Sequence, residues 1–288
     1  MSLTDLLLVI AAAVIHACWN LLAKRAQGGG RLIWGYSLFS TIVYLPMAAW
    51  LIQRDGLHWS ALQWALVLAS TFFNIGYAIC LQRGYRLADM SVVYPLARGS
   101  GPLLSVSGAI LLLGERPSWL AAVGALLVVG GVFMLAGGPA MFRWPDARLR
   151  AGLGYGLATG AFIACYTLSD GYAVQHLQIA PLLLCYFGSA LRLLIMAPHA
   201  LGDREDLLAT FRSKWPHMLG IGALAPLSYI LVLTAMQTAP ISYVAPAREM
   251  SMLLGAFFGA RLLGEGDVAR RLAGAALIAA GVAGLALG

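Results

Sequence analysis

The segment Tyr85–Glu115, YRLADMSVVYPLARGSGPLLSVSGAILLLGE, decides the class of fold. Its stretch from Ser91 to Leu113 is long and apolar enough to cross a bilayer, yet it contains an arginine, Arg98. A charged side chain inside a membrane-spanning helix costs free energy unless it faces a cavity or a partner. The residues that share one face of this helix, from i to i+14, are Tyr94, Arg98, Gly101, Ser105 and Gly108. We therefore expect this face to line a water-accessible passage.

The composition extends the membrane interpretation to the whole chain. Of the 288 residues, 60% are hydrophobic and 11% are charged, and the mean hydropathy of +0.80 is atypical of a soluble domain. A spanning helix needs about 20 apolar residues, and turn signals divide the chain into ten such segments. The sequence thus predicts an all-α polytopic membrane protein with ten transmembrane helices. The predicted spans are Leu3–Ala23, Leu32–Ile52, Ala61–Leu81, Ser91–Leu113, Pro117–Ala136, Leu149–Ser169, Ile179–Ala200, Pro216–Met236, Ile241–Leu263 and Val268–Leu287.

The cysteines and the N-terminus give no sign of a metal, a cofactor or a cleaved leader. The four cysteines, Cys18, Cys80, Cys165 and Cys185, lie inside predicted spans and form no CxxC pair. We interpret them as small apolar packing residues and predict neither a metal site nor a cofactor. No basic region precedes the first apolar segment, so we expect an uncleaved span there.

The basic residues predict the orientation of the chain. Fourteen of the nineteen Lys and Arg residues lie in the predicted loops of one side, whereas the loops of the other side contain only Arg54 and Arg116. Basic loops face the cytoplasm, so we expect both termini on the non-cytoplasmic side of a bacterial-type inner (plasma) membrane. This topology explains the net charge of +7. No basic stripe with interleaved aromatic residues lies outside the spans, so the expected partners are lipid and a small molecule, with no nucleic acid.

The sequence repeats itself after about 150 residues. The matched segments include Ala17-Cys18-Trp19 with Ala164-Cys165-Tyr166, Ala97-Arg98 with Ala247-Arg248, and Leu113-Gly114-Glu115 with Leu263-Gly264-Glu265. Each copy holds five predicted spans, and because five is odd the second copy must be inverted relative to the first. The predicted organisation is a first repeat at 1–138, a loop at 139–148 and a second, inverted repeat at 149–288. Secondary transporters are often built in this way, with the substrate near the midplane between the repeats.

The repeat carries motifs that resemble a known family. A Pro-x-x-Arg segment begins at Pro95, a Pro-x-Arg segment begins at Pro246, and Leu-Leu-Gly-Glu ends at Glu115 and at Glu265. Together with the five-plus-five duplication, these motifs resemble the EamA family of the drug/metabolite transporter superfamily. The segments around Trp19, Tyr77 and Tyr94-Pro95 are most similar to its exporters of aromatic and other neutral amino acids. The resemblance implies a transporter and not an enzyme.

The candidate substrate-binding residues combine aromatic rings with arginines. Their positions in the predicted spans place Trp19, Tyr77 and Tyr94 in one half of the membrane and Tyr166 and Tyr229 in the other, with Arg98 and Arg248 between the two layers. Aromatic faces bind ammonium groups and stack on apolar side chains, and arginine binds carboxylates through a planar fork. An amino acid needs all of these contacts. Alternatively, the aromatic residues form interfacial belts and the arginines brace carbonyl groups near the prolines.

Two further residues are candidates for charge pairing or proton coupling. Glu249 follows Arg248 directly, and it could accept a coupling proton or neutralise Arg98 or Arg248. His16 lies one turn before Trp19 and could titrate during transport, or could be a packing residue. Arg192 lies inside a predicted span, where a bracing role is expected. The glycine-rich spans Pro117–Ala136 and Val268–Leu287 are expected to form a packing scaffold away from the passage.

We predict a ten-helix transporter that exports amino acids by alternating access between its inverted halves. One alternative is a carrier of sugar phosphates, nucleotide sugars or other metabolites, because Arg98 and Arg248 would suit a phosphate. An intramembrane lipid-modifying enzyme is disfavoured, since the sequence contains no HExxH, GxSxG or phosphate-cradling glycine loop. A nonselective channel is disfavoured by the inverted repeats. The pattern leaves the oligomeric state open.

Overall fold

The computed structural model describes residues 1–288 except 27–28, 89, 136–146 and 253–267. Within these limits the chain is helical and contains no strand, in agreement with the predicted all-α fold. Its helices are α1 (Leu3–Ala26), α2 (Gly30–Asp55), α3 (Ala61–Leu87), α4 (Met90–Leu113), α5 (Trp119–Leu135), α6 (Ala147–Gln175), α7 (Pro181–Leu201), α8 (Arg204–Met236), α9 (Ile241–Ala247), the 3-10 helix η2 (Arg248–Met250) and α11 (Val268–Leu287).

Seven described helices are long and apolar enough to cross a membrane: α1, α2, α3, α4, α6, α7 and α8. The apolar helices α5 and α11 are shorter. The predicted ninth span, Ile241–Leu263, begins as α9 and continues through η2, and its part after residue 252 lies outside the described residues. Three predicted boundaries differ from the helices by six residues or more. Helix α3 continues to Leu87 instead of ending at Leu81, α6 continues to Gln175 instead of ending at Ser169, and α8 begins at Arg204, twelve residues before Pro216.

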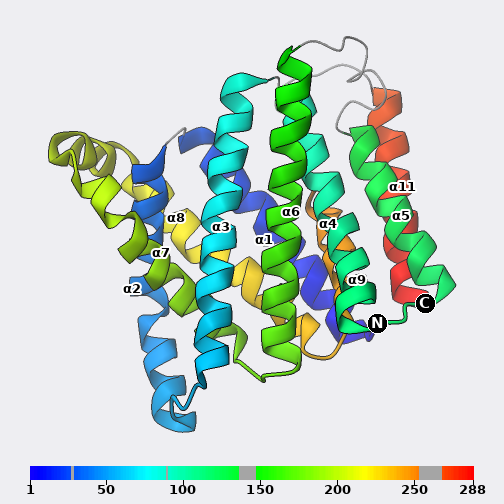
Figure 1. Ribbon diagram of the computed structural model, residues 1–288, viewed down its shortest axis with the longest axis horizontal. Helices are drawn as coiled ribbons and strands as arrows, with labels where there is room; N and C mark the ends of the chain where they lie inside the picture. Colours follow the sequence, from blue (N-terminus) through cyan, green and yellow to red (C-terminus); the bar gives the residue numbers. More distant parts are fainter. Residues whose placement is uncertain (27–28, 89, 136–146, 253–267) are drawn as a thin grey trace.

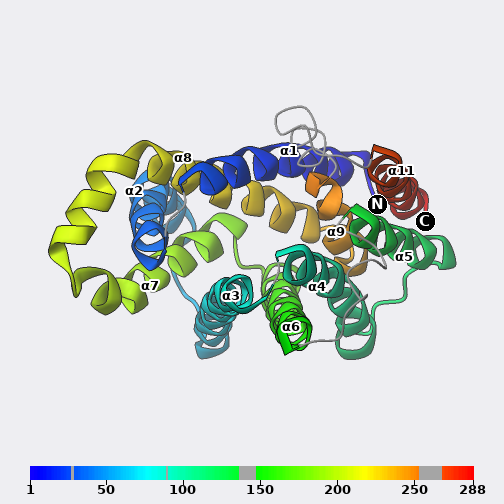
Figure 2. The same ribbon diagram turned by 90° about the horizontal axis from the view of Figure 1, so that it is seen from above.

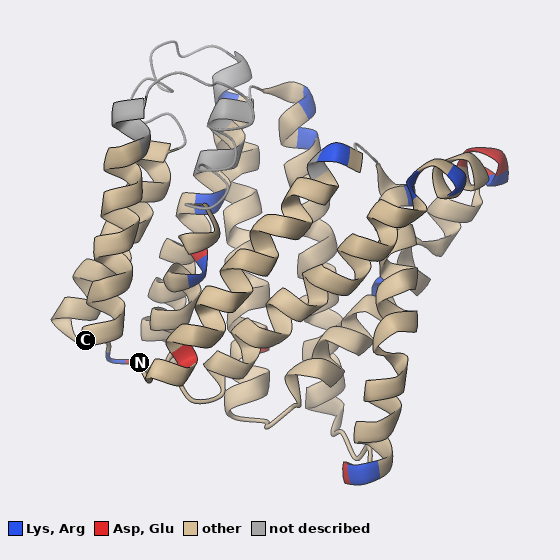
Figure 3. Ribbon diagram, turned by 180° about the vertical axis from the view of Figure 1, so that it is seen from behind, with Lys and Arg blue, Asp and Glu red and all other residues tan. Residues whose placement is uncertain are grey.

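The long helices run back and forth between the two ends of the molecule (Figure 1). Helix α1 leaves the end at which both termini lie, whereas α6 runs toward that end, so the first helices of the two halves point in opposite directions (Figure 1). Most of the described Lys and Arg residues at the helix ends lie at the end opposite the termini (Figure 3). The exceptions are Arg54, which pairs with Asp55 in the last turn of α2, and Arg116, in the connection between α4 and α5 that lies near the termini (Figure 3).

Helices of the two halves pack mainly against each other. Helix α1 packs on α8, α3 and α4 pack on α6, and α2 packs on α7 and α8. Helices α5 and α11 form a separate pair at one side of the molecule, with α2 and α7 at the other (Figure 2). A Cβ atom on Gly124 would lie 2.6 Å from the carbonyl oxygen of Gly281, and one on Gly131 would lie 2.6 Å from that of Gly274. The glycines therefore let these two backbones touch.

Glycines also hold α4 close to α6. A Cβ atom on Gly160 would collide with the Ser100 hydroxyl, and one on Gly101 would lie 2.9 Å from the Ile163 side chain. Small residues on both helices thus let α4, which carries Arg98, pack closely against α6, which carries Tyr166. This α4–α6 contact joins the two halves of the chain.

The Leu-Leu-Gly-Glu motif that follows α4 ties the first half to the second. Gly114 adopts a φ of +72°, which favours glycine, and turns the chain so that Glu115 reaches the start of α9. The Glu115 carboxylate accepts hydrogen bonds from the backbone N–H groups of Ile241 at 2.7 Å and Ser242 at 2.9 Å. Glu115 caps a helix of the other half, and its counterpart Glu265 lies outside the described residues.

Candidate functional site

A cavity of about 220 Å³ lies between the two halves of the molecule. Its wall is formed by residues of α1, α2, α3, α4, α6, α7, α8 and η2. Neither α5 nor α11 contributes a described residue to this wall. These two glycine-rich helices thus lie outside the cavity, as their small-residue surfaces indicated.

Four of the predicted aromatic residues line the cavity: Trp19, Tyr77, Tyr166 and Tyr229. The rings of Tyr77 and Tyr166 meet edge to face at 6.3 Å, and those of Tyr166 and Tyr229 meet in the same way at 6.0 Å. The two expected aromatic layers are therefore in direct contact. The predicted Tyr94 lies in α4, but its side chain falls outside the described residues.

Trp19 lies on α1 beside His16, and both side chains line the cavity. Their rings meet edge to face, with centroids 4.8 Å apart. The Trp19 indole nitrogen has no hydrogen-bond partner among the described residues. An apolar ring with an unused donor is suited to contact a bound molecule.

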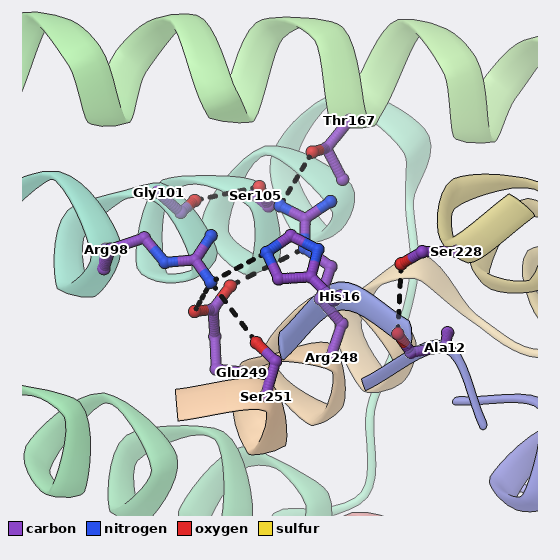
Figure 4. Close-up of polar contacts among 10 residues, drawn as sticks. All are labelled: Ala12, His16, Arg98, Gly101, Ser105, Thr167, Ser228, Arg248, Glu249 and Ser251. Atoms are coloured by element: carbon purple, nitrogen blue, oxygen red, sulfur yellow. Dashed lines mark hydrogen bonds and ion pairs between the residues drawn. The ribbon is translucent and has the colours of Figure 1, made fainter. Parts of the chain in front are cut away.

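Arg98 and Arg248 lie at one side of the cavity and share the Glu249 carboxylate (Figure 4). Glu249 is 3.1 Å from Arg98 and 3.6 Å from Arg248, and its side chain is only 1% exposed. It does not line the cavity itself. Since a buried charge is costly unless paired, Glu249 stabilises two guanidinium groups that come from different halves of the chain.

Contacts of the two arginines with α1, α6 and Ser251 complete this cluster. Arg98 donates to the Ser251 hydroxyl at 3.4 Å and approaches the Nε2 atom of His16 at 3.5 Å. Arg248 donates to the Thr167 hydroxyl at 3.4 Å, and its guanidinium carbon lies 5.9 Å from the centre of the Tyr166 ring. The arginine cluster thus joins α1, α4, α6 and η2 at the inner wall of the cavity (Figure 4).

The sequence analysis missed an acidic residue of the cavity, Asp170 on α6. The Tyr229 hydroxyl donates to its Oδ2 atom at 2.6 Å. Its Oδ1 atom has no hydrogen-bond partner in the described part of the chain, although the residue is only 1% exposed. Asp170 was missed because the predicted span ended one residue before it. Its position one helical turn after Tyr166, on the same helix face, could have identified Asp170 as a cavity residue.

Arg192 on α7 both braces a neighbouring helix and lines the cavity. Its Nε atom donates to the Ser37 hydroxyl at 2.9 Å, and its guanidinium carbon lies 5.4 Å from the centre of the Tyr36 ring. None of the ion pairs in the described part of the chain includes Arg192. The expected bracing role therefore accounts for only part of its surroundings.

Long apolar helices around an internal cavity with charged and aromatic residues in its wall are typical of a polytopic membrane protein. The model of the EamA-like transporter family matches residues 3–137 and 150–287, which is nearly the whole chain. The protein therefore belongs to the EamA-like transporter family, whose members are membrane transporters of the drug/metabolite superfamily.

The fold has counterparts among solved structures. One crystal structure, described only as that of a protein, matches with a TM-score of 0.74 and 15% sequence identity, over 100% of this chain and 98% of that chain. At this identity the likeness concerns the fold alone. A search of curated proteins found no match.

Proposed function

We propose that this protein is a secondary transporter that exports aromatic and other neutral amino acids. The observation that carries this proposal is the cavity, which combines tyrosine and tryptophan rings with buried arginines and one buried carboxylate. Aromatic rings suit the side chain of such a substrate, and the charged groups suit its carboxylate and ammonium groups. No covalent step is needed.

The volume of the cavity favours a small substrate. It measures about 220 Å³, whereas pockets for drug-sized ligands hold roughly 300–1,000 Å³. A nucleotide sugar would not fit without a large rearrangement. The carrier of sugar phosphates or nucleotide sugars remains the second candidate for the Arg98–Arg248 pair, but the Glu249 carboxylate already occupies both guanidinium groups.

The proposed mechanism is alternating access between two inverted five-helix repeats with ten spans in all. Helix α1 of the first repeat corresponds to α6 of the second, and α3 corresponds to α8. The α1–α8 contact is therefore the counterpart of the α6–α3 contact, and both contacts are extensive. Opening one of them and then the other would expose the same cavity to each side of the membrane. We place the protein in a bacterial-type inner membrane with both termini on the non-cytoplasmic side, because the basic helix ends lie opposite the termini.

Counterflow in liposomes tests this function. The purified full chain is reconstituted into liposomes loaded with one unlabelled amino acid at a time, and uptake of radiolabelled L-phenylalanine is measured. We expect uptake to exceed that of empty liposomes when the load is an aromatic or neutral amino acid. Absence of uptake with every load in a broad amino-acid panel would refute the proposal. Counterflow of radiolabelled phosphate into phosphate-loaded liposomes, without any amino-acid counterflow, would favour the second candidate.

A further inference from the structure

We propose that Asp170 and Arg192 recognise the two charged groups of the substrate in the cavity, Asp170 an ammonium group and Arg192 a carboxylate. The transported molecule would then be selected as a zwitterion. This inference rests on the proposed function and assigns roles to two residues that the motifs of the sequence did not indicate.

Asp170 is a buried carboxylate with room to accept a further hydrogen bond. It forms no ion pair with any described residue. The Tyr229 hydroxyl donates to its Oδ2 atom and the Ser70 side chain also interacts with the carboxylate, yet the Oδ1 atom has no well-formed hydrogen bond among the described residues. Leaving a buried carboxylate oxygen without a donor costs free energy. An ammonium group beside Asp170 would donate to this oxygen, and the ring of Tyr229, whose hydroxyl bonds to Asp170, would add cation–π attraction.

Arg192 has complementary surroundings on α7. One nitrogen, Nε, is occupied by Ser37, and the described part of the chain provides no carboxylate for the rest of the guanidinium group. The side chain is only half buried and lines the same cavity as Asp170. A guanidinium with free donors facing a cavity binds a carboxylate in the usual bidentate manner.

The other two arginines of the cavity are less suited to this task. Both are engaged with Glu249, and Arg248 is 7% exposed. A substrate carboxylate would have to compete with a carboxylate that is already buried and paired. No described carboxylate forms an ion pair with Arg192. We therefore assign the substrate carboxylate to Arg192 on α7 and not to the Arg98–Arg248 pair.

The distribution of charge explains why a zwitterion fits. Asp170 and Arg192 line one small cavity yet do not pair with each other. An amine without a carboxylate would satisfy only Asp170, and an acid without an amine would satisfy only Arg192. A molecule with both groups compensates both residues at once.

Binding of three matched ligands to the purified full chain tests the assignment. The ligands are L-phenylalanine, phenethylamine, which lacks the carboxylate, and 3-phenylpropionate, which lacks the ammonium group. We expect Asp170→Asn to weaken L-phenylalanine and phenethylamine at least tenfold and to leave 3-phenylpropionate unchanged. We expect Arg192→Gln to weaken L-phenylalanine and 3-phenylpropionate at least tenfold and to leave phenethylamine unchanged.

Two substitutions outside the cavity serve as matched controls. Asp5→Asn removes a buried carboxylate that bonds to Ser2 and Thr238, and Arg31→Gln removes an arginine that pairs with Asp203. Both controls should leave the affinities for all three ligands unchanged. If Asp170→Asn fails to fold, Asp170→Glu replaces it, and if Arg192→Gln fails to fold, Arg192→Lys replaces it. Each replacement keeps the charge but shifts its position. The loss of affinity should affect the same two ligands as for the original variant.

Three results would overturn the assignment. The first is equal weakening of all three ligands by Asp170→Asn, which indicates a structural role. The second is an unchanged affinity for L-phenylalanine in either variant. The third is loss of pH-driven transport in Asp170→Asn with all affinities retained, which makes Asp170 a proton carrier. The proposed function fails separately, when the unaltered protein moves no amino acid, whereas the present inference fails when it moves L-phenylalanine without this pattern.

Discussion

The Glu249 carboxylate lies between two guanidinium groups that come from the two halves of the chain. Sequence reasoning left two roles open for it, charge pairing and proton coupling. The geometry favours charge pairing, because the carboxylate lies within ion-pair distance of both guanidinium groups. The residue thus contributes to the contact between the halves at the point where they enclose the cavity.

Glu249→Gln tests this role. Removing one partner of a buried ion pair costs about 3–5 kcal/mol, so we expect a lower melting temperature of the detergent-solubilised protein and less folded protein in the membrane. Adding Arg98→Gln should restore part of the stability, because it removes one of the uncompensated charges. Full stability of Glu249→Gln combined with loss of pH-dependent transport would instead assign the coupling proton to Glu249.

Trp19 provides the test of the aromatic wall. An aromatic contact contributes about 0.5–1.5 kcal/mol, so Trp19→Ala should weaken substrate binding roughly two- to tenfold and should not reduce the folded yield. The control is Trp119→Ala on α5, where the ring is 77% exposed and lies outside the cavity. Transport by Trp19→Ala at the rate of the unaltered protein, measured in the same liposomes, would remove Trp19 from the site.

At the scale of elements, the helices divide into those that surround the cavity and the pair α5 and α11, which does not. The pair meets through backbone contacts at Gly124 with Gly281 and Gly131 with Gly274. Such contacts tolerate no added side chain, because the neighbouring atoms belong to a backbone that cannot move aside. Substitutions here should therefore affect assembly before they affect selectivity.

Gly281→Leu tests this division. We expect a lower monodisperse fraction in fluorescence-detected size-exclusion chromatography, with unchanged substrate preference in the protein that does fold. Gly130→Leu is the matched control, because nothing lies within 4 Å of a Cβ atom at that position on α5. A Gly281→Leu protein that folds fully but prefers a different substrate would contradict the scaffold role.

At the scale of the whole molecule, hydropathy and the internal repeat were sufficient to predict the helical fold and several of the residues that line the cavity. Both signals depend on local sequence, and Trp19, Arg98 and Arg248 stand out as aromatic or charged residues in apolar segments. Asp170 did not stand out, because the last turn of α6 is held by a tertiary contact. There the Gln175 amide donates to the Ala239 carbonyl at 2.9 Å, and hydropathy does not report such a contact.

The inverted arrangement of the two halves can be tested by labelling single cysteines in intact cells. In a protein whose four native cysteines are replaced by alanine, Gly29→Cys marks the first connection of the first half and Gln178→Cys marks that of the second. Both positions are exposed. We expect a membrane-impermeant maleimide to label Gln178→Cys from outside, and to label Gly29→Cys only after permeabilisation, because inverted repeats place these connections on opposite sides. His58→Cys, between α2 and α3, should behave as Gln178→Cys does. If Gly29→Cys and Gln178→Cys are both labelled from the same side of the membrane, the inverted arrangement is excluded. If Gly29→Cys is instead labelled from outside and Gln178→Cys only after permeabilisation, the inverted arrangement stands and only the predicted orientation is reversed.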